Sequence, residues 1–327
     1  MVYNVKLFDL HEDLSSYILR SRELVDLNKD VDRHADIPKY KRSNTKAIVA
    51  AIFPASYSKT EDLVKHKVTF KNSFNEVFNH LLVYYKLVKE YRVFKIIEKK
   101  RELENIFDQR RRIGLVIGLE GSYPIREPDE LEIFYRLGVR VLGLTWNVDN
   151  QYAASCMTTK DYGLTSLGVK LVEKALDLGM VLDLAHSSPK TMKDVLSIVD
   201  KPVIVSHTGF KKFNNSPRNI DDEILDMVKR NRGVVGIFFV TDFLEGEQTS
   251  IDTVVKHILY VRENYGIDVL AIGSDYFGTE KLPKGLEDIG KINSLAENLL
   301  ENGLSKDDIE KIFYKNALRV FLENLKN

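Results

Sequence analysis

The sequence places metal-capable side chains at the ends of five of its apolar runs. Imidazole and carboxylate groups together bind borderline ions such as zinc, whereas magnesium and calcium prefer shells made only of oxygen. Three histidines and several carboxylates at such positions therefore predict a centre for a pair of ions. In chain order these residues are Asp9, His11, Asp13, Glu120, Asp183, His186, His207 and Asp275.

The spacing around the first run narrows the choice of ligands only in part. Side chains alternate between the two faces of a strand, so His11 and Asp13 lie on one side and could hold one ion together. Asp9 has the same parity, and the spacing leaves open which two of the three bind. Gly273, two residues before Asp275, is expected to leave the interior of the fold open beside it. Four histidines lie in helical or loop stretches and receive no role: His34, His66, His80 and His257.

The elements that must position these residues are eight short apolar runs, separated mostly by helical patterns. Most runs are apolar throughout rather than alternating, which is typical of parallel strands covered on both faces. Eight strands with intervening helices in 327 residues predict an α/β fold, a (β/α)8 TIM-type barrel whose catalytic residues lie at the carboxyl ends of the strands. No Gly-x-Gly-x-x-Gly motif follows the first run, which argues against a dinucleotide-binding sheet. The runs are residues 5–10, 47–53, 114–119, 139–144, 180–184, 202–205, 234–240 and 269–272.

Apolar residues at helical spacing predict helices at 167–178 and 220–228, and two further segments exceed a minimal barrel. Residues 56–112, between the second and third strands, read as a long helical connection. Residues 285–327 read as two terminal helices, the second beginning at Ser305 with Asp308 in a near capping-box arrangement. With no linker or internal repeat, residues 1–327 are predicted to form a single domain. The long connection carries an apolar stripe of Phe74, Val77, Phe78, Leu81, Leu82, Tyr85 and Val88.

Composition excludes several classes of protein. The 48 basic and 48 acidic side chains give a formal net charge of zero, so no nucleic-acid partner is expected, and the basic residues at 99–101 and 110–112 are interpreted as a solvated helix face. The single cysteine, Cys156, can form no intrachain disulfide and gives no sign of an oxidising compartment. No apolar stretch approaches the roughly 20 residues that cross a bilayer, and the first ten residues already read as a strand rather than a signal peptide. A cytoplasmic protein without a membrane partner is expected.

Seven motifs resemble, in order and with similar spacing, the membrane (renal-type) dipeptidase family of zinc metallopeptidases, a branch of the amidohydrolase-like barrels. Each motif is weak alone, but seven in register from residue 9 to residue 321 are specific. They are His11-x-Asp13, Leu119-Glu120-Gly121, Asp183-Leu-Ala-His186-Ser, Val205-Ser-His207, Ser216-Pro-Arg218-Asn219, Ile272-Gly-Ser-Asp275 and Asn316-Ala-Leu-Arg319-Val-Phe321.

The resemblance implies a dipeptidase with two Zn²⁺ ions per subunit and a small peptide as substrate. His11 and Asp13 would hold one ion, His186 and His207 the other, and Glu120 would bridge them. A hydroxide held between the ions would be the nucleophile. Asp275 would carry the proton from the attacking water to the leaving amine. Arg218 would bind the substrate's C-terminal carboxylate, a role suited to a planar guanidinium. Family members often form homodimers, and the sequence leaves the oligomeric state open.

Two departures from the family pattern bear on the substrate. The fourth strand is followed by Thr145-Trp146-Asn147, where better-known dipeptidases carry histidine in place of Trp146. The indole N–H can donate one hydrogen bond, but it is neutral and bulkier than imidazole, so Trp146 is either a wall of the substrate pocket or packing at the barrel rim. The second departure is Phe277, where an acid is frequent, and it is interpreted as loop packing.

Three functions follow from these residues. A zinc dipeptidase is the leading hypothesis. Trp146 motivates a second, in which the same binuclear site hydrolyses another amide, an N-acyl amino acid or a lactone. The third is a non-catalytic metal-binding protein on an inherited barrel, which the full set of expected ligands disfavours.

Overall fold

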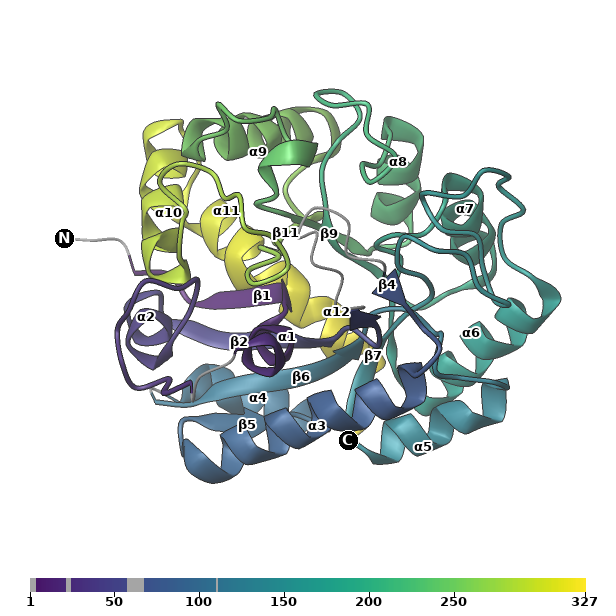
Figure 1. Cartoon of the computed structure of the whole chain (residues 1–327). Coiled ribbons are helices and arrows are strands. Elements are labelled where there is room, and N and C mark those ends of the chain that lie inside the picture. Colours follow the sequence, from purple (N-terminus) through teal and green to yellow (C-terminus); the bar gives the residue numbers. More distant parts are fainter. Residues whose placement is uncertain (1–3, 22–24, 58–67, 110) are drawn as a thin grey trace.

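The computed structural model contains a closed ring of eight parallel strands with helices packed around it (Figure 1). It describes residues 4–21, 25–57, 68–109 and 111–327. Strand β1 pairs with β2 and with β11, and β2 also pairs with β6, which closes the ring. The predicted (β/α)8 barrel and all eight predicted strands are confirmed. The barrel strands are β1 (Leu7–Glu12), β2 (Thr45–Ile52), β6 (Ile113–Leu119), β7 (Val139–Gly143), β8 (Val181–Asp183), β9 (Ile204–Thr208), β10 (Val234–Ile237) and β11 (Leu270–Ile272).

Every residue of these eight strands is buried, which explains why their sequences are mostly apolar. One face of each strand contacts the surrounding helices, and the other fills the barrel interior. The surrounding helices in the second half of the chain begin at side-chain caps. Thr165, Ser188 and Asp221 each accept a hydrogen bond from a backbone N–H of the first turn. The predicted helix at 220–228 accordingly begins two residues later, after its Asp221 cap.

Helices lie between the barrel strands along the chain, and the last three helices follow β11. Among the described residues, no helix is long and apolar enough to cross a membrane. The helices are α1 (Leu14–Arg20), α2 (Ile37–Arg42), α3 (Ser73–Glu90), α4 (Lys100–Asp108), α5 (Leu131–Arg136), α6 (Ser166–Leu178), α7 (Pro189–Ile198), α8 (Asp222–Arg230), α9 (Ile251–Tyr265), α10 (Ile292–Glu301), α11 (Lys306–Glu310) and α12 (Asn316–Asn324).

The connection between β2 and β6 is not the single helical stretch that its sequence indicates. It contains the short hairpin β3 (Ser56–Tyr57) and β4 (Val68–Thr69), then α3, the strand β5 (Phe94–Ile96) beside β6, and α4. The basic segments therefore do not form one helix face, because α4 ends at Asp108. Lys99 and Arg101 at its start and Arg111 and Arg112 beyond it are exposed, and Arg110 lies outside the described residues.

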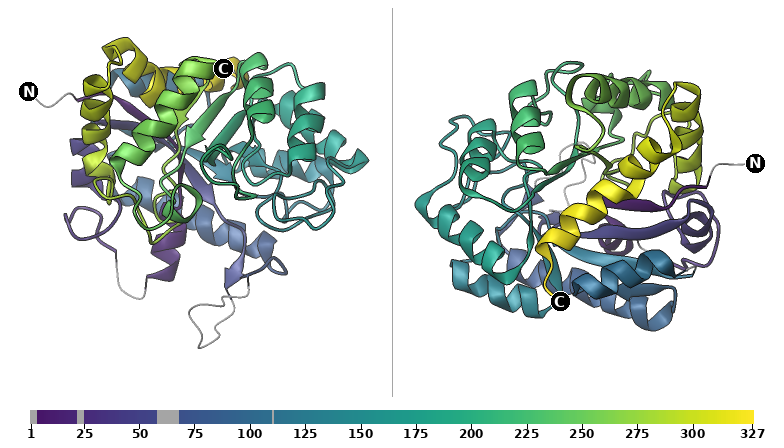
Figure 2. Two further views of the ribbon diagram at one scale, coloured as in Figure 1. Left: turned by 90° about the horizontal axis from the view of Figure 1, so that it is seen from above. Right: turned by 180° about the vertical axis from the view of Figure 1, so that it is seen from behind.

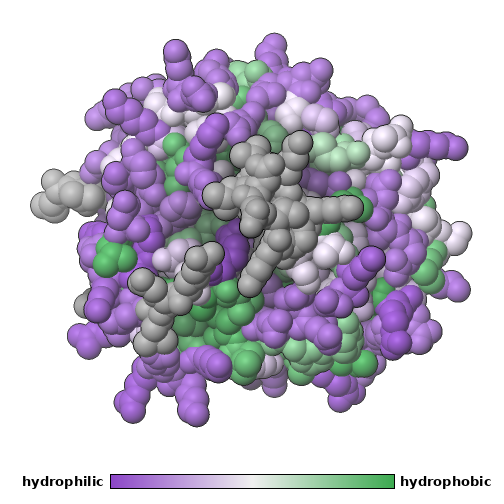
Figure 3. Space-filling view, in the orientation of Figure 1, coloured by the Kyte–Doolittle hydropathy of each residue, from purple (hydrophilic) through white to green (hydrophobic). Residues whose placement is uncertain are grey.

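The predicted apolar stripe on α3 is only partly buried. Val77 and Leu81 face the protein, but Phe74, Phe78 and Leu82 are between 41% and 52% exposed. Hydrophobic residues accordingly reach the surface in the lower part of Figure 3, where α3 runs in Figure 1. The buried face is rotated toward Tyr84, whose hydroxyl donates a 2.7 Å hydrogen bond to the Ala51 carbonyl of β2. That tertiary bond is not visible in helical periodicity.

The C-terminal helices close the amino-end opening of the barrel. Ser305 and Asp308 form the predicted capping box, and α11 continues through a π-helical turn (Lys311–Lys315) into α12. Figure 2 shows this helix lying across the back of the strands. Phe321 of α12 packs on Phe8 of β1 with ring centroids 4.8 Å apart. The amino-terminal end of the barrel is therefore covered, and the carboxyl-terminal end is left for a site.

Two strands are bulged at the histidines they carry. The pairing of β1 with β2 shifts register between Asp9 and Glu12, and the pairing of β9 with β10 shifts between residues 205 and 208. A bulge adds one residue to a strand and re-aims its side chains. His11 and His207 lie in these two bulges. The alternation that gave Asp9 the parity of His11 is thus interrupted between them.

Gly273 does not leave open space, contrary to the expectation from the sequence. A Cβ atom at Gly273 would lie 1.7 Å from the Ser206 carbonyl oxygen, and one at Gly236 would lie 2.0 Å from it. Gly236 in β10 and Gly273 directly after β11 therefore leave room for the backbone of the bulged strand β9. Their role is close packing beneath the site.

We expect Gly273→Ala to lower the free energy of unfolding by about 1–3 kcal/mol, because the added methyl group meets backbone that cannot turn away. Gly114→Ala in β6 is the matched control, since its Cβ would meet only the side chain of Ile97, at 2.8 Å. Denaturant unfolding of both variants measures the difference. Equal stability of the two variants would contradict the close-packing role of Gly273.

Candidate functional site

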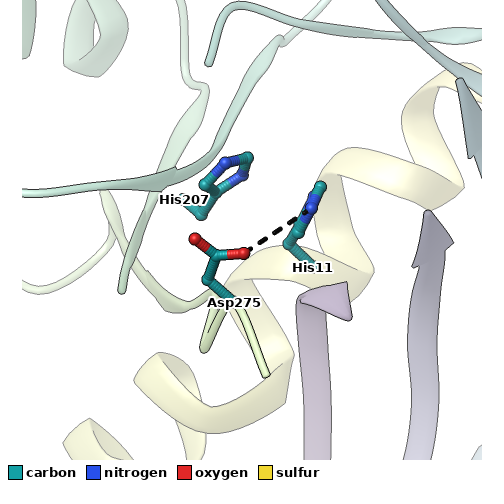
Figure 4. A group of neighbouring side chains, drawn as sticks. All are labelled: His11, His207 and Asp275. Atoms are coloured by element: carbon teal, nitrogen blue, oxygen red, sulfur yellow. Dashed lines mark ion pairs between the residues drawn. The ribbon is translucent and has the colours of Figure 1, made fainter. Parts of the chain in front are cut away.

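The predicted metal-capable side chains converge at the carboxyl ends of the strands. Three overlapping groups have ligand atoms within 4.8 Å of one another: His11, Asp13 and Glu120; Glu120, His186 and His207; and His11, His207 and Asp275. Figure 4 shows the third group, with His11 from β1, His207 from β9 and Asp275 from the loop after β11 pointing toward one another. All five candidate ligands and the candidate proton carrier, Asp275, are thus within one small region.

The carboxylate of Glu120 lies at the junction of the groups. Its Oε1 atom is 3.0 Å from Nε2 of His186, 3.7 Å from Nε2 of His207 and 3.8 Å from Nε2 of His11. On the far side of His11, Oδ2 of Asp13 is 3.3 Å from the same Nε2. One carboxylate oxygen surrounded by three imidazole nitrogens is the arrangement expected of a ligand shared by two ions.

Asp9 turns away from this cluster and supports the backbone instead. Its Oδ1 accepts hydrogen bonds from the backbone N–H groups of His11 at 3.2 Å and Ser274 at 2.8 Å. The β1 bulge separates it from His11 and Asp13, which share the site. The choice that the spacing left open therefore falls on His11 and Asp13.

Hydrogen bonds at the far ring nitrogens orient two of the histidines. Nδ1 of His186 is 2.7 Å from Oδ1 of Asn147, and Nδ1 of His207 is 2.8 Å from the Ser206 hydroxyl. An amide oxygen can only accept, so His186 donates through Nδ1 and keeps a lone pair on Nε2. Partners of this kind fix the tautomer of metal-binding histidines. Asn147 and Ser206 each stand beside a site residue in the sequence, but no pattern in the sequence indicates that they orient histidine rings.

The nitrogen atoms that face the site lack ordinary partners. Nε2 of His11 is buried and makes no hydrogen bond with any residue that the structure describes, while the Nε2 atoms of His186 and His207 lie 2.9 Å apart. Lone pairs on both of those nitrogens would repel each other unless a cation lay beside them. The donor set of imidazoles and carboxylates fits zinc, and the residues present therefore fit a metal centre.

Burial sets the electrostatics of the cluster. It raises the pKa of Glu120 to about 8 and that of Asp275 to about 7, because neighbouring carboxylates add to the cost of each charge. It holds the pKa values of His186 and His207 well below the usual range, which keeps both imidazoles neutral. For His11, burial also lowers the pKa, but the charges of Glu120, Asp13 and Asp275 outweigh it and raise the value to about 10. A bound cation would therefore stabilise the ionised carboxylates of the cluster.

Two site residues have left-handed backbone conformations, which are rare outside glycine. His186 has φ 62° and Asp275 has φ 64°, a strain of order 1–3 kcal/mol each. The carbonyl of His186 accepts hydrogen bonds from the backbone of Cys156 at 2.7 Å and the Thr145 hydroxyl at 3.0 Å, and the N–H of Asp275 donates to the His11 carbonyl at 3.1 Å. The surrounding structure thus holds both residues in place.

Arg218 and Trp146 flank the cluster. Arg218 is buried, its Nη2 donates to the His207 carbonyl at 3.0 Å, and it forms no ion pair within the described part of the chain. Its charge partly offsets the effect of burial on the pKa of Glu120 and of Asp275. The ring of Trp146 lies 5.9 Å from that of His186 and 4.9 Å from that of Phe53. Both residues named from the sequence thus contact histidines of the cluster, and their roles toward a substrate stay predictions.

A small cavity of about 80 Å³ opens onto the cluster. Trp146 forms part of its wall, so the structure favours the pocket-wall interpretation over packing at the barrel rim. Phe277, the second departure, is buried between Tyr17 and His34 with ring centroids 4.7 Å and 5.2 Å away, in agreement with the interpretation as loop packing. The cavity is lined by Asp13, Ser16, Arg20, Phe53, Glu120, Trp146, His186, His207, Asp275 and Gly278.

Comparison with known families gives a match along the whole chain. Residues 1–327 match the sequence model of Peptidase M19, described as membrane dipeptidase (peptidase family M19). Among curated proteins, the dipeptidase VerJ of Clonostachys rogersoniana is 36% identical over 212 residues, which is 64% of this chain and 55% of that protein. An uncharacterised dipeptidase of Schizosaccharomyces pombe is 37% identical over 218 residues, or 65% and 53%. The matched part spans about half the length of these relatives.

The fold is shared with solved structures. A metallopeptidase from Rhodobacter sphaeroides, solved with a phosphinate mimic of the dipeptide L-Ala-D-Ala, superposes with a TM-score of 0.88 at 23% identity and covers 98% of this chain and 99% of its own. A probable dipeptidase, PvdM, from Pseudomonas aeruginosa superposes with a TM-score of 0.83 at 19% identity, with coverage of 98% and 95%. At these identities the likeness establishes the barrel architecture.

Proposed function

The chain belongs to the membrane dipeptidase family, peptidase family M19, and we propose that it is a zinc-dependent dipeptidase. The observation that carries the proposal is the convergence of three imidazole nitrogens on one oxygen of Glu120. Because the curated dipeptidases are matched over only about half their length, the site geometry must support the activity independently. The absence of disulfide potential, with Cys156 alone, also leads us to propose a cytoplasmic location.

Two zinc ions would be held by the chain's own residues, His11 and Asp13 on one side and His186 and His207 on the other, with Glu120 shared. When bound, zinc supplies Lewis-acid chemistry, lowering the pKa of water and polarising a carbonyl. Both imidazoles of the second pair are held neutral by burial, which is the form that binds metal.

Asp275 is the residue we assign to proton transfer. Its Oδ1 lies 4.0 Å from Nε2 of His11, and its side chain is 15% exposed, so it can reach both the metal site and a bound substrate. It would accept a proton from the attacking water and deliver that proton to the amine that leaves when the peptide bond breaks. The positive φ at Asp275 aims the carboxylate at this position.

We expect the purified protein to bind about two zinc ions per chain and to hydrolyse dipeptides in a chelator-sensitive manner. Glu120→Gln removes the negative charge of the carboxylate that both ions would share. Zinc affinity should therefore fall by more than the roughly 10- to 100-fold that is lost when a hydrogen-bonding partner of a metal ligand is removed. Elemental analysis and hydrolysis of an L-L and L-D dipeptide panel measure both effects. Glu127→Gln, an exposed carboxylate elsewhere, is the control. A wild-type protein that binds no zinc after reconstitution would refute the proposal.

Arg218 is proposed to bind the free carboxylate of the substrate, since its buried guanidinium has no carboxylate partner among the described residues. Arg218→Ala should lower kcat/KM for free dipeptides by about 30-fold or more, corresponding to the 2 kcal/mol or more that a lost buried charge pair costs. Arg218→Lys should retain only part of the wild-type kcat/KM, because lysine keeps the charge but lacks the planar guanidinium that can form two parallel hydrogen bonds to a carboxylate. Kinetics on free and C-terminally amidated dipeptides test this. An unchanged preference for the free carboxylate would remove Arg218 from substrate binding.

A second candidate function is hydrolysis of another amide, an N-acyl amino acid or a lactone at the same site. Trp146 favours it, because a bulky neutral ring stands in the cavity wall beside His186. If this reading is correct, the wild-type protein cleaves such compounds but no dipeptide, and Trp146→His gains measurable dipeptide hydrolysis. Parallel assays of both proteins on both substrate groups distinguish the two functions. Efficient dipeptide cleavage by the wild type would exclude the second.

A further inference from the structure

A buried aspartate lies behind the two histidines of the second zinc pair. Asp183, at the end of β8, is 7% exposed. Its Oδ1 accepts hydrogen bonds from the backbone N–H groups of Ala185 at 3.0 Å and Ser206 at 2.9 Å. Its Oδ2 accepts a 2.5 Å hydrogen bond from the Ser206 hydroxyl. The carboxylate therefore joins β8 to β9 one residue before His207.

The Ser206 hydroxyl connects this carboxylate to the ring of His207. A hydroxyl has a single proton to donate, and here it is directed to Asp183. The Ser206 oxygen can then only accept from Nδ1 of His207, 2.8 Å away. His207 consequently carries its proton on Nδ1, and its Nε2, 3.7 Å from Oε1 of Glu120, keeps the lone pair that a metal needs.

We propose that Asp183 is a positioning residue that fixes the tautomer of His207 through Ser206, so that Nε2 is available to the metal. The inference rests on the proposed zinc site but concerns the chain's own hydrogen bonds. Carboxylate partners of metal-binding histidines are common. In this protein the Ser206 hydroxyl lies between the Asp183 carboxylate and the His207 ring. Whether that hydroxyl donates its proton to the carboxylate or to the ring decides which ring nitrogen keeps a lone pair.

Asparagine at position 183 would reverse that order. The two backbone N–H groups at Oδ1 require an acceptor, so the amide oxygen must occupy that side and the amide nitrogen must replace Oδ2. The nitrogen would then donate to the Ser206 hydroxyl, whose own proton would turn to Nδ1 of His207. That ring would carry its proton on Nε2, which then could not bind a metal ion without a change of tautomer.

Asp9 provides a matched control on the other side of the barrel. Its Oδ1 accepts from the backbone of His11 and of Ser274, as Asp183 does from Ala185 and Ser206. Residue 275, after Ser274, is an aspartate, so no imidazole depends on this serine. Asp9→Asn changes the same chemical group in the same kind of backbone cap. No histidine ring follows Ser274 in the way that His207 follows Ser206.

The first test is the tautomer of His207 in the metal-free protein. With only seven histidines in the chain, ¹⁵N-histidine NMR can assign the ring, with His207→Gln identifying its signals. We expect the Nδ1–H pattern in the wild type and in Asp9→Asn, and the Nε2–H pattern in Asp183→Asn. Retention of the Nδ1–H form in Asp183→Asn would overturn the proposal.

The second test is zinc affinity by chelator competition in a double-mutant cycle with Ser206→Ala. Asp183→Asn should weaken zinc binding by roughly 10- to 100-fold, and the double variant should bind no more weakly than Ser206→Ala alone. Losses that multiply would mean that Asp183 acts on the fold rather than through Ser206, and would refute the inference. If the wild type binds no zinc while the His207 tautomer still responds to Asp183→Asn, the proposed function fails and the positioning role stands.

Discussion

The whole carboxyl-end face is organised around one shared carboxylate. Glu120 brings a buried negative charge to within 3.0–3.8 Å of three imidazole nitrogens, and the acids Asp13 and Asp275 lie around the same histidines. Burying several carboxylates together is costly unless positive charge balances them. The pKa values of Glu120 and Asp275, raised by burial to about 8 and about 7, express that cost in the metal-free chain. Bound metal ions would relieve that cost, which would couple the folding of this face to metal binding.

Backbone irregularity is what allows a regular barrel to assemble this cluster. The strand alternation alone would not turn His11 and His207 toward Glu120; both lie where register shifts mark bulges. The bulge in β9 pushes the Ser206 carbonyl into space that only Gly236 and Gly273 leave free. The loops add His186 and Asp275 in left-handed conformations. Strain is thus concentrated at the site, and the closely packed strands beneath it supply the stability that holds it.

The sequence predicts the strands and the residues of the cluster well because both depend on local signals. Apolar runs of four to seven residues identify all eight barrel strands, and parallel topology then brings their carboxyl ends together. The failures have a common origin in non-local contacts. Parity grouped Asp9 with His11 because a bulge leaves no mark in the residue pattern. The apolar stripe on α3 does not by itself say which of its residues are buried, because the hydrogen bond from Tyr84 to Ala51 orients the helix. The space at Gly273 is filled by a carbonyl from a strand two positions away in the sheet.

The residues proposed to hold metal and those proposed to contact the substrate come from different parts of the fold. The metal candidates stand on or directly beside the strands, each fixed by backbone hydrogen bonds or by a partner such as Asn147 or Ser206. Arg218 and Trp146 stand in loops between strands and helices, the parts of a fold in which sequences vary most among related proteins. Because Asn147 directly follows Trp146 in the loop after β7, the same short segment orients a metal-binding imidazole and forms the wall of the cavity. On the proposed function, substitution at position 146 alters the substrate while Asn147 keeps its hydrogen bond to the ring of His186.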